Sequence, residues 1–326
     1  MLNVRHKPVM VEETLEALKV RSGGQYIDCT VGEGGHADAL LGTTNHTARL
    51  LGIDLDSEAL EVANTRLRQY GDRVDLIKGT FAEIESLTLI KGLGLVDGVL
   101  FDLGVSSLQL ETAKRGFSFS REGPLDMRFN GEQKMSASDV VNRWKEAELA
   151  SLLKEYGEEP RAKQVARGIV GARPITTTAD LAKVAARSAK RSPRRINPAT
   201  KTFQAIRMAV NGETGNIKMG LEQATRVLAP GGRLVAISYH SLEDRIVKQW
   251  FRRESSSCIC STEVPECACN HSATLRLIDR RVKRPTAEEI RENPRSRSAR
   301  LRVAERLGTR SPDDKGDMKI SGVIQR

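Results

Sequence analysis

The chain has 326 residues, 39% of them apolar and 29% charged, which is enough for two domains and excludes a wholly disordered protein. Its formal net charge of +10 favours a polyanionic partner, because Lys and Arg that neutralise phosphates release condensed counterions. No apolar run reaches the roughly 18 residues of a membrane span, and no signal-peptide stretch lies near the start. We therefore expect a cytoplasmic protein that does not contact a membrane.

Strand and helix signals alternate over the first part of the chain. Short β-rich apolar runs lie at Tyr26–Cys29, Leu50–Ile53, Val74–Ile77 and Val96–Phe101. Helical runs separate them: one ends near Leu41, and another begins near Ser57 with apolar residues three and four positions apart. Apolar strands separated by helices predict an α/β fold with a mostly parallel, Rossmann-like sheet and right-handed crossovers.

This alternation stops between about Ala113 and Met208, where the strand signal is weak. Helical patterns there cover Lys145–Tyr156, Arg161–Ala172 and Ala179–Ala189, and a strand signal returns at Leu234–Ser238. We therefore predict a discontinuous α/β domain of residues 1–112 and 209–306. A helical insert of residues 113–208 would recognise the substrate, and residues 307–326 would form a disordered polar tail.

One stretch of the predicted insert is unusually basic. Residues 181–212 contain eight Lys or Arg and no acid, whereas a solvated helix face usually mixes both signs. We therefore expect this stretch to contact nucleic acid, although a purely solvated surface remains the alternative. The residues assigned to this contact are Lys190, Arg191, Arg194, Arg195, Lys201 and Arg207.

A glycine-rich turn at residues 28–36, DCTVGEGGH, follows the first predicted strand, and Asp54 ends the second. Glycines at such a turn let a ligand approach the backbone, and an acid at the second strand end can accept bonds from ribose hydroxyls. The pattern also fits the dinucleotide fingerprint, so alone it indicates an adenosine cofactor without separating NAD from S-adenosylmethionine. A purely structural turn is the other alternative.

An acid-led loop, residues 101–107 (FDLGVSS), follows the fourth predicted strand. Asp102 lies at the carboxyl end of a central strand, where open α/β sheets bind their ligands. Hydride transfer needs no such acid, whereas methylation of an amino group needs an acceptor that orients the amine beside the methyl donor. The alternative is that Asp102 only caps its strand. Methylation at cytosine C5 would need a cysteine nucleophile, and no cysteine occupies a strand-end catalytic loop.

Several long segments, in order, resemble the bacterial small-subunit rRNA (cytosine-N4)-methyltransferase family, known as RsmH or MraW. They are DCTVGEGGH (28–36), FDLGVSSLQL (101–110), RGFSF (115–119), GPLDMR (123–128), KTFQAIRMAVN (201–211) and SYHSLEDRIVK (238–248). The resemblance implies a class I S-adenosylmethionine-dependent methyltransferase with a helical insert. It also implies methylation of N4 of one cytidine in the decoding region of small-subunit rRNA, in an assembled or late-assembly subunit.

The resemblance also assigns site residues. Cofactor contacts would fall on Gly34, Gly35, His36, Asp54, Phe81, Asp102 and Gln109, and Asp102 would be the catalytic residue. In this family a loop follows the fifth strand, and it would place Tyr239 and His240 near the target base. A second interpretation of this loop is a helix start in which Ser241 is the capping residue and Asp244 completes a capping box. Both interpretations can hold together.

Four of the five cysteines, Cys258, Cys260, Cys267 and Cys269, cluster in a segment that many family members lack. Four thiolates can bind zinc tetrahedrally, but this spacing is tighter than the usual zinc knuckle and methyl transfer requires no metal. No metal is therefore assigned, and structural zinc, free thiols and a conditional disulfide stay open.

Two other functions remain alternatives to the enzyme. The chain could be a non-catalytic, S-adenosylmethionine-binding ribosome-assembly factor whose basic insert grips rRNA, or, third, an NAD-dependent oxidoreductase. The Asp102 loop favours a methyltransferase. Whether the chain forms a homodimer is left open by the sequence.

Overall fold

The computed structural model describes residues 7–45, 47–188, 197–261 and 267–308. The basic residues Lys190, Arg191, Arg194 and Arg195 lie outside these ranges, and so does nearly all of the predicted tail, residues 309–326. Within the described ranges, no helix combines the length and apolar character that crossing a bilayer requires.

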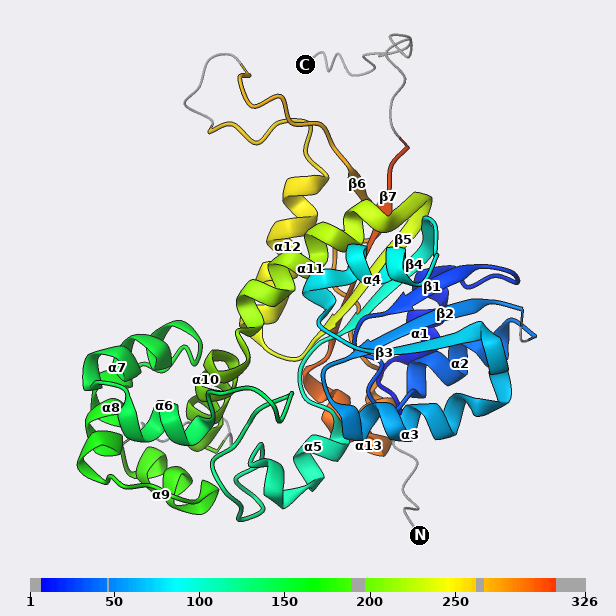
Figure 1. Ribbon diagram of the computed structural model, residues 1–326. Coiled ribbons are helices and arrows are strands. Elements are labelled where there is room, and N and C mark those ends of the chain that lie inside the picture. The colour runs from blue at the N-terminus through cyan, green and yellow to red at the C-terminus, as the bar shows by residue number, and fades with distance from the viewer. Residues whose placement is uncertain (1–6, 46, 189–196, 262–266, 309–326) are drawn as a thin grey trace.

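Seven strands form one sheet in the order β3-β2-β1-β4-β5-β7-β6 (Figure 1). They are β1 Gln25–Asp28, β2 Arg49–Asp54, β3 Val74–Lys78, β4 Val96–Asp102, β5 Leu228–Ser238, β6 Leu275–Leu277 and β7 Arg300–Arg306. The pairings among β1 to β5 are parallel, and β7 pairs antiparallel with both β5 and β6. The predicted α/β fold with a mostly parallel sheet is confirmed. The strand order reverses between β1 and β4, where such sheets open a ligand crevice.

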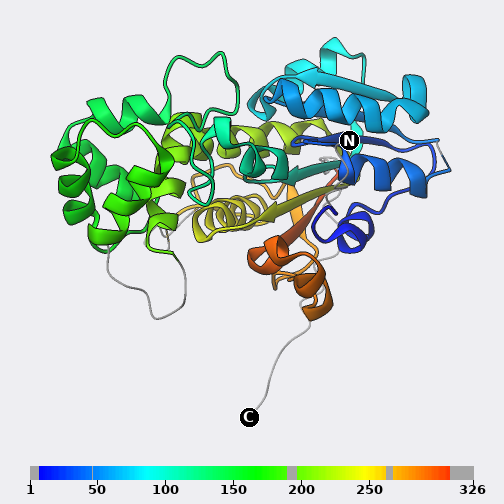
Figure 2. The same ribbon diagram turned by 90° about the horizontal axis from the view of Figure 1, so that it is seen from below.

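Helices cover both faces of this sheet (Figure 2). One face packs against α1 Val11–Leu18, α2 Gly35–Thr43 and α3 Ser57–Leu67, and the other against α4 Ile84–Ile90, α11 Glu213–Val227 and α12 Ser241–Glu254. Neighbouring strand residues alternate between the two cores: Leu100 belongs to the first and Phe101 to the second. This two-residue period is what a strand buried on both sides requires.

The chain between β4 and α11 builds a separate group of helices, drawn in green beside the sheet (Figure 1). After the short α5 Ser107–Glu111 come α6 Ala137–Arg143, α7 Glu146–Glu155, α8 Ala162–Gly171, α9 Thr178–Ser188 and α10 Ala199–Asn211. Their apolar side chains bury one another in a core of their own that includes Leu149, Leu153, Val165, Ile169, Leu181 and Ile206. We call residues 137–211 the helical unit.

The helical unit should owe its stability to this core. Leu153 of α7 is fully buried, whereas Ser151 on the same helix is exposed. We expect Leu153→Ala to lower the free energy of unfolding by about 2–5 kcal/mol, because it removes transfer free energy and leaves a cavity. Ser151→Ala should change it by less than about 0.5 kcal/mol. Denaturant titrations of the two variants and the parent measure the difference, and equal effects would contradict the packing.

Candidate functional site

A cavity of about 410 Å³ opens at the carboxyl ends of β1, β2 and β4. Its wall combines carboxylates with apolar side chains and includes residues from the glycine turn, the Asp102 loop and α11. The lining residues include Gly35, His36, Asp54, Phe81, Asp102 and Tyr239. The cavity thus lies at the crevice that the reversal of strand order creates.

The glycine turn shapes the floor of the cavity and orients Asp54. Gly32 has a positive φ of 50°, and its backbone N–H donates to Asp54 Oδ2 at 2.8 Å. Gly35 leaves no room for a side chain, since a Cβ there would lie 2.4 Å from Pro8 Cγ. Gly34 does not line the cavity; it begins α2 with a φ of 78°. Gly34 therefore acts on the shape of the turn, whereas Gly35 lies at the cavity wall.

Two carboxylates at the strand ends, the buried Asp28 and the partly buried Asp54, are costly to ionise. Burial raises the pKa of Asp54 to about 6, although backbone N–H groups of Asp56 and Gly32 partly offset the desolvation. Burial likewise raises the pKa of Asp28, to about 7, against the opposing effect of His36. Both acids therefore change protonation near neutral pH, where an exposed aspartate would stay ionised.

Phe81 and Gln109, both assigned from the resemblance, line the cavity. Phe81 follows β3 and packs edge-on against Phe101 with ring centroids 5.5 Å apart, which leaves an aromatic wall. Gln109 lies in α5, where its Oε1 accepts from the Ser106 N–H and its Nε2 donates to Asp56 Oδ2 at 2.9 Å. Both ends of its side-chain amide are thus already hydrogen-bonded, the oxygen within the capping box of α5 and the nitrogen to Asp56.

Asp102 ends β4 with its carboxylate at the cavity, and 23% of its side chain is exposed. The Tyr239 hydroxyl donates to Asp102 Oδ1 at 2.8 Å, and His36 Nε2 lies 3.5 Å from Oδ2. Burial lowers the pKa of His36, but the carboxylates of Asp102 and Asp28 outweigh this and raise it. Burial and the same Asp102 charge raise the pKa of Tyr239, so its phenol keeps its proton. The structure therefore brings His36, Asp102 and Tyr239 together.

A cluster of buried charges lies behind Tyr239. Arg207 forms two bonds with Glu213, at 2.7 and 2.8 Å, and its guanidinium lies 3.4 Å from Glu243 Oε1. His240 Nε2 is 2.8 Å from the same Glu243 oxygen. These partners hold the pKa of Glu243 at about 2 despite its complete burial. His240 and Arg207 are therefore engaged inside the protein, and His240 does not line the cavity.

The helix start after β5 differs from the predicted one. His240, not Ser241, is the residue before α12, and its box partner is Glu243 rather than Asp244. Ser241 instead donates to Glu158 Oε2 at 2.6 Å, in the helical unit. The proposed Ser241 cap was wrong by one residue, because the imidazole Nδ1 can accept the Glu243 N–H as a hydroxyl would.

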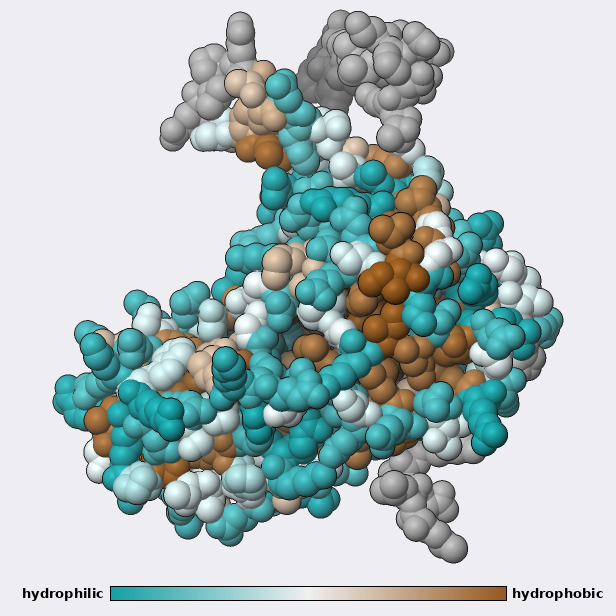
Figure 3. Space-filling view, viewed as in Figure 1, coloured by the Kyte–Doolittle hydropathy of each residue, from teal (hydrophilic) through white to brown (hydrophobic). Residues whose placement is uncertain are grey.

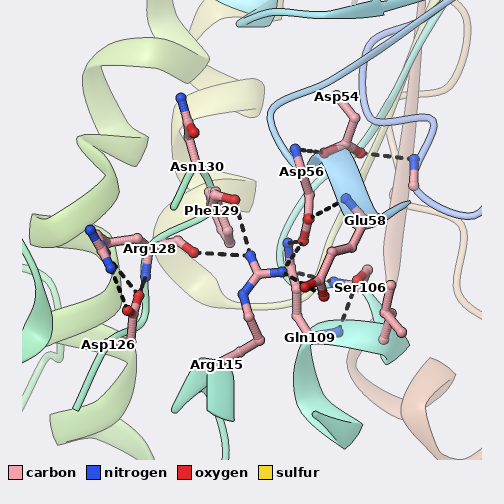
Figure 4. A network of polar contacts seen from close by, with 12 residues as sticks. Asp54, Asp56, Glu58, Ser106, Gln109, Arg115, Asp126, Arg128, Phe129 and Asn130 are labelled. Atoms are coloured by element: carbon pink, nitrogen blue, oxygen red, sulfur yellow. Dashed lines mark hydrogen bonds and ion pairs between the residues drawn. The ribbon is translucent and has the colours of Figure 1, made fainter. Parts of the chain in front are cut away.

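Sequence reasoning missed the contact that joins three segments around Asp56 (Figure 4). Arg115 donates to Asp56 Oδ2 at 2.7 Å, and its other nitrogen donates to the carbonyls of Arg128 and Phe129. Asp56 also accepts the Glu58 N–H and so caps α3. Arg115 belongs to the motif RGFSF, but its partner Asp56 lies 59 residues earlier in the chain.

Of the predicted RNA-contacting basic residues, Lys201 and Arg207 are within the described ranges. Lys201 is on α10, where its Nζ donates to the Glu158 carbonyl at 2.7 Å and remains at the surface. Arg207, on the same helix, points instead toward the cavity and is largely buried. The two residues therefore cannot play the same part in binding a polyanion.

A model of the MraW methylase family matches residues 3–307, which is nearly the whole chain. The chain belongs to this family. A relative from Dehalococcoides mccartyi, named ribosomal RNA small subunit methyltransferase H, is 48% identical over 307 residues, covering 94% of this chain and 88% of the relative. Relatives of the same name from Symbiobacterium thermophilum and Geobacter sulfurreducens are 47% and 48% identical, covering 93% of this chain and 96% and 99% of theirs. The predicted family is confirmed.

The Arg115–Asp56 pair should be essential for stability in this MraW-family protein. Its side chains are 12% and 3% exposed, so Arg115→Leu would leave a buried carboxylate without its cation and should cost about 3–5 kcal/mol of unfolding free energy. Lys114→Leu is the matched control, since it breaks an exposed pair with Glu58 and should cost less than about 1 kcal/mol. Urea titrations compare the two variants. An equal loss of unfolding free energy would show that the buried pair contributes no more to stability than the exposed one.

Cofactor binding should weaken on acidification through Asp54. Its pKa of about 6 means that roughly a tenth of the carboxylate is ionised at about pH 5, so the Kd of S-adenosylhomocysteine should rise about tenfold from pH 7. Asp54→Asn should bind weakly, with most of this pH dependence removed. Titration calorimetry across this range measures both. An unchanged pH dependence in the variant would assign it to Asp28 or His36 instead.

Proposed function

We propose that the protein transfers a methyl group from S-adenosylmethionine to the N4 amino group of a specific cytidine in the decoding region of small-subunit ribosomal RNA. Family membership supports the reaction class, and the relatives' name supports the RNA. The single observation that carries the chemistry is the partly exposed Asp102 carboxylate, which lies at the cavity at the end of β4 between the Tyr239 hydroxyl and His36.

The residues of the cavity fit an adenosine-containing methyl donor. The carboxylate of Asp54 could accept from ribose hydroxyls, and the Phe81 ring offers an apolar wall for adenine. His36 is buried at the cavity wall: Nε2 lies 3.5 Å from Asp102 Oδ2, and Nδ1 has no hydrogen-bond partner among the described residues, so a bound polar group could complete Nδ1. Gly35 lines the cavity and lets Pro8, another lining residue, pack closely against the glycine turn. When bound, S-adenosylmethionine supplies an electrophilic methyl group on a sulfonium.

The exocyclic amine of cytosine is a poor nucleophile because its lone pair is delocalised into the ring. An acceptor that holds one N–H turns the lone pair toward the methyl group, and positioning supplies much of the rate of an in-line displacement. In this proposal Asp102 is that acceptor and stabilises the positive charge that develops on nitrogen as the new N–C bond forms. The proton then leaves the nitrogen toward Asp102 or solvent.

The competing route through C5 has no suitable nucleophile among the described residues. The thiol in the cavity wall, Cys29, is 1% exposed, and burial raises its pKa well above the ordinary value, so it stays protonated. The four other cysteines lie together in the segment after α12. This favours nitrogen as the methyl acceptor.

The target base must leave its stack to reach such a cavity. Tyr239 and Phe129, both cavity-lining aromatics, are candidates to stack on it. The division into a methyltransferase domain of residues 1–112 and 209–306 and a recognition insert of residues 113–208 belongs to this proposal. In it, Lys201 and the basic residues beside it contact phosphates of a late-assembly or assembled small subunit, in the cytoplasm. The proposal holds for a monomer or a homodimer.

The test is methyl transfer from labelled S-adenosylmethionine to undermethylated small subunits, followed by nucleoside mass spectrometry. The parent protein should produce N4-methylcytidine. Asp102→Ala should lower the rate by at least about a hundredfold, because a preorganised acceptor beside the reacting nitrogen is lost, while RNA binding stays unchanged. Formation of 5-methylcytidine or methyladenosine would contradict the site.

Two controls sharpen this experiment. Tyr239→Phe keeps the ring and removes only the bond to Asp102, so its rate should fall less than about tenfold. Calorimetry with S-adenosylhomocysteine checks that Asp102→Ala still folds and binds. If the parent protein bound small subunits at every assembly stage and methylated none, its function would be that of a non-catalytic assembly factor.

A further inference from the structure

The described residues between α12 and β6, 255–261 and 267–274, stand away from the sheet and the helical unit (Figure 1) and form a protrusion in the space-filling view (Figure 3). Its base is closed by Thr274, whose N–H donates to the Glu254 carbonyl at 2.8 Å and whose hydroxyl donates to Glu254 Oε2 at 2.6 Å. Beyond this base, the described residues form neither helix nor strand. We call residues 255–274 the cysteine loop.

Four cysteine sulfurs meet in this loop. The Sγ atoms of Cys258, Cys260, Cys267 and Cys269 all lie within 4.8 Å of one another. Two of the separations are 3.6 Å, between Cys267 and Cys269, and 3.8 Å, between Cys269 and Cys258. Zinc–sulfur bonds of about 2.3 Å in a tetrahedron place sulfurs about 3.8 Å apart, whereas a disulfide needs about 2.05 Å. These two separations match the edge of a zinc–thiolate tetrahedron, and the bound of 4.8 Å keeps the other pairs close enough to share one ion.

The backbone around the cluster is arranged to stabilise sulfur charge. The Ile259 N–H donates to Cys269 Sγ at 3.5 Å, and the Cys260 N–H donates to Cys258 Sγ at 3.4 Å. Such donors orient metal-bound thiolates and offset their negative charge. The last turn of α12 adds Arg252 and Arg253 at the start of the loop. A complex of four thiolates with one divalent cation carries two net negative charges, part of which these backbone N–H donors offset.

The loop has little else to hold its shape. Its apolar side chain Ile259 is 42% exposed, and no residue between 255 and 261 is buried. A loop of this length without secondary structure or a core is uncommon unless something ties it. In such segments the free energy of metal binding stabilises the folded state directly, since the unfolded chain has no preformed site.

We propose that Cys258, Cys260, Cys267 and Cys269 bind one zinc ion as a structural site that folds the cysteine loop. All four positions are filled by protein, so the site has no open position for a substrate. It is independent of the methyl transfer at the cavity and contributes local order to the loop.

The test uses the full-length protein purified under reducing, anaerobic conditions with zinc present and then dialysed. Elemental mass spectrometry should find about one zinc per chain. Cys258→Ser and Cys267→Ser should each lose most of it, whereas Cys29→Ala, the control for the buried fifth cysteine, should retain it. Replacement by Co²⁺ should give the intense visible d–d bands of a tetrahedral thiolate site, and these bands should be absent in Cys258→Ser.

Other outcomes would overturn the proposal. A parent protein that holds no zinc after this treatment has free thiols or disulfides at the cluster, and mass spectrometry of the alkylated chain under non-reducing conditions tells which. Equal zinc content in the parent and the Cys258→Ser variant would place the metal elsewhere. Circular dichroism melting of each variant checks that the remainder of the protein is folded, so metal loss can be assigned to the loop.

Discussion

The parallel sheet places acidic residues at the ends of three neighbouring strands, and two of them, Asp54 and Asp102, line one crevice. Asp28, Asp54 and Asp102 end β1, β2 and β4, and register pairs these strands so that their carboxyl ends meet at one edge. Desolvation makes this costly, as the raised pKa values of Asp28 and Asp54 show. Backbone N–H groups of the glycine turn offset part of that cost. The turn therefore stabilises the acidic crevice as well as shaping it.

Buried polar contacts connect this crevice to the inserted segment. Arg115 reaches Asp56, two residues after the end of β2, and at the same time binds the carbonyls of Arg128 and Phe129. Asn211, at the end of α10, accepts the Phe129 N–H at 2.8 Å and donates to the Met127 carbonyl. Both ends of the chain segment between β4 and α11 are thus fixed beside the cavity wall.

Local patterns in the sequence predicted the parts of the fold whose causes are local. The strand ends carrying Asp54 and Asp102 follow from short apolar runs and were placed within a residue or two. Strand β7 was missed because its arginines at 300, 302 and 306 resemble a basic surface; Arg300 and Arg302 in fact contact Asp244 of α12. The His240 cap and the Arg115–Asp56 pair were missed for a related reason. Each depends on tertiary neighbours that no periodicity in one segment reveals.

The distribution of charge gives the two proposed ligands, RNA and S-adenosylmethionine, different places to bind. The chain carries a net charge of +10, which attracts a polyanion, yet the crevice itself presents the carboxylates of Asp54 and Asp102. A sulfonium is a cation, so this crevice favours it in the midst of a basic protein. After transfer the donor is a neutral thioether, and this part of the attraction disappears. In the proposed reaction, the Asp102 carboxylate would therefore both orient the amine and help the spent cofactor to leave.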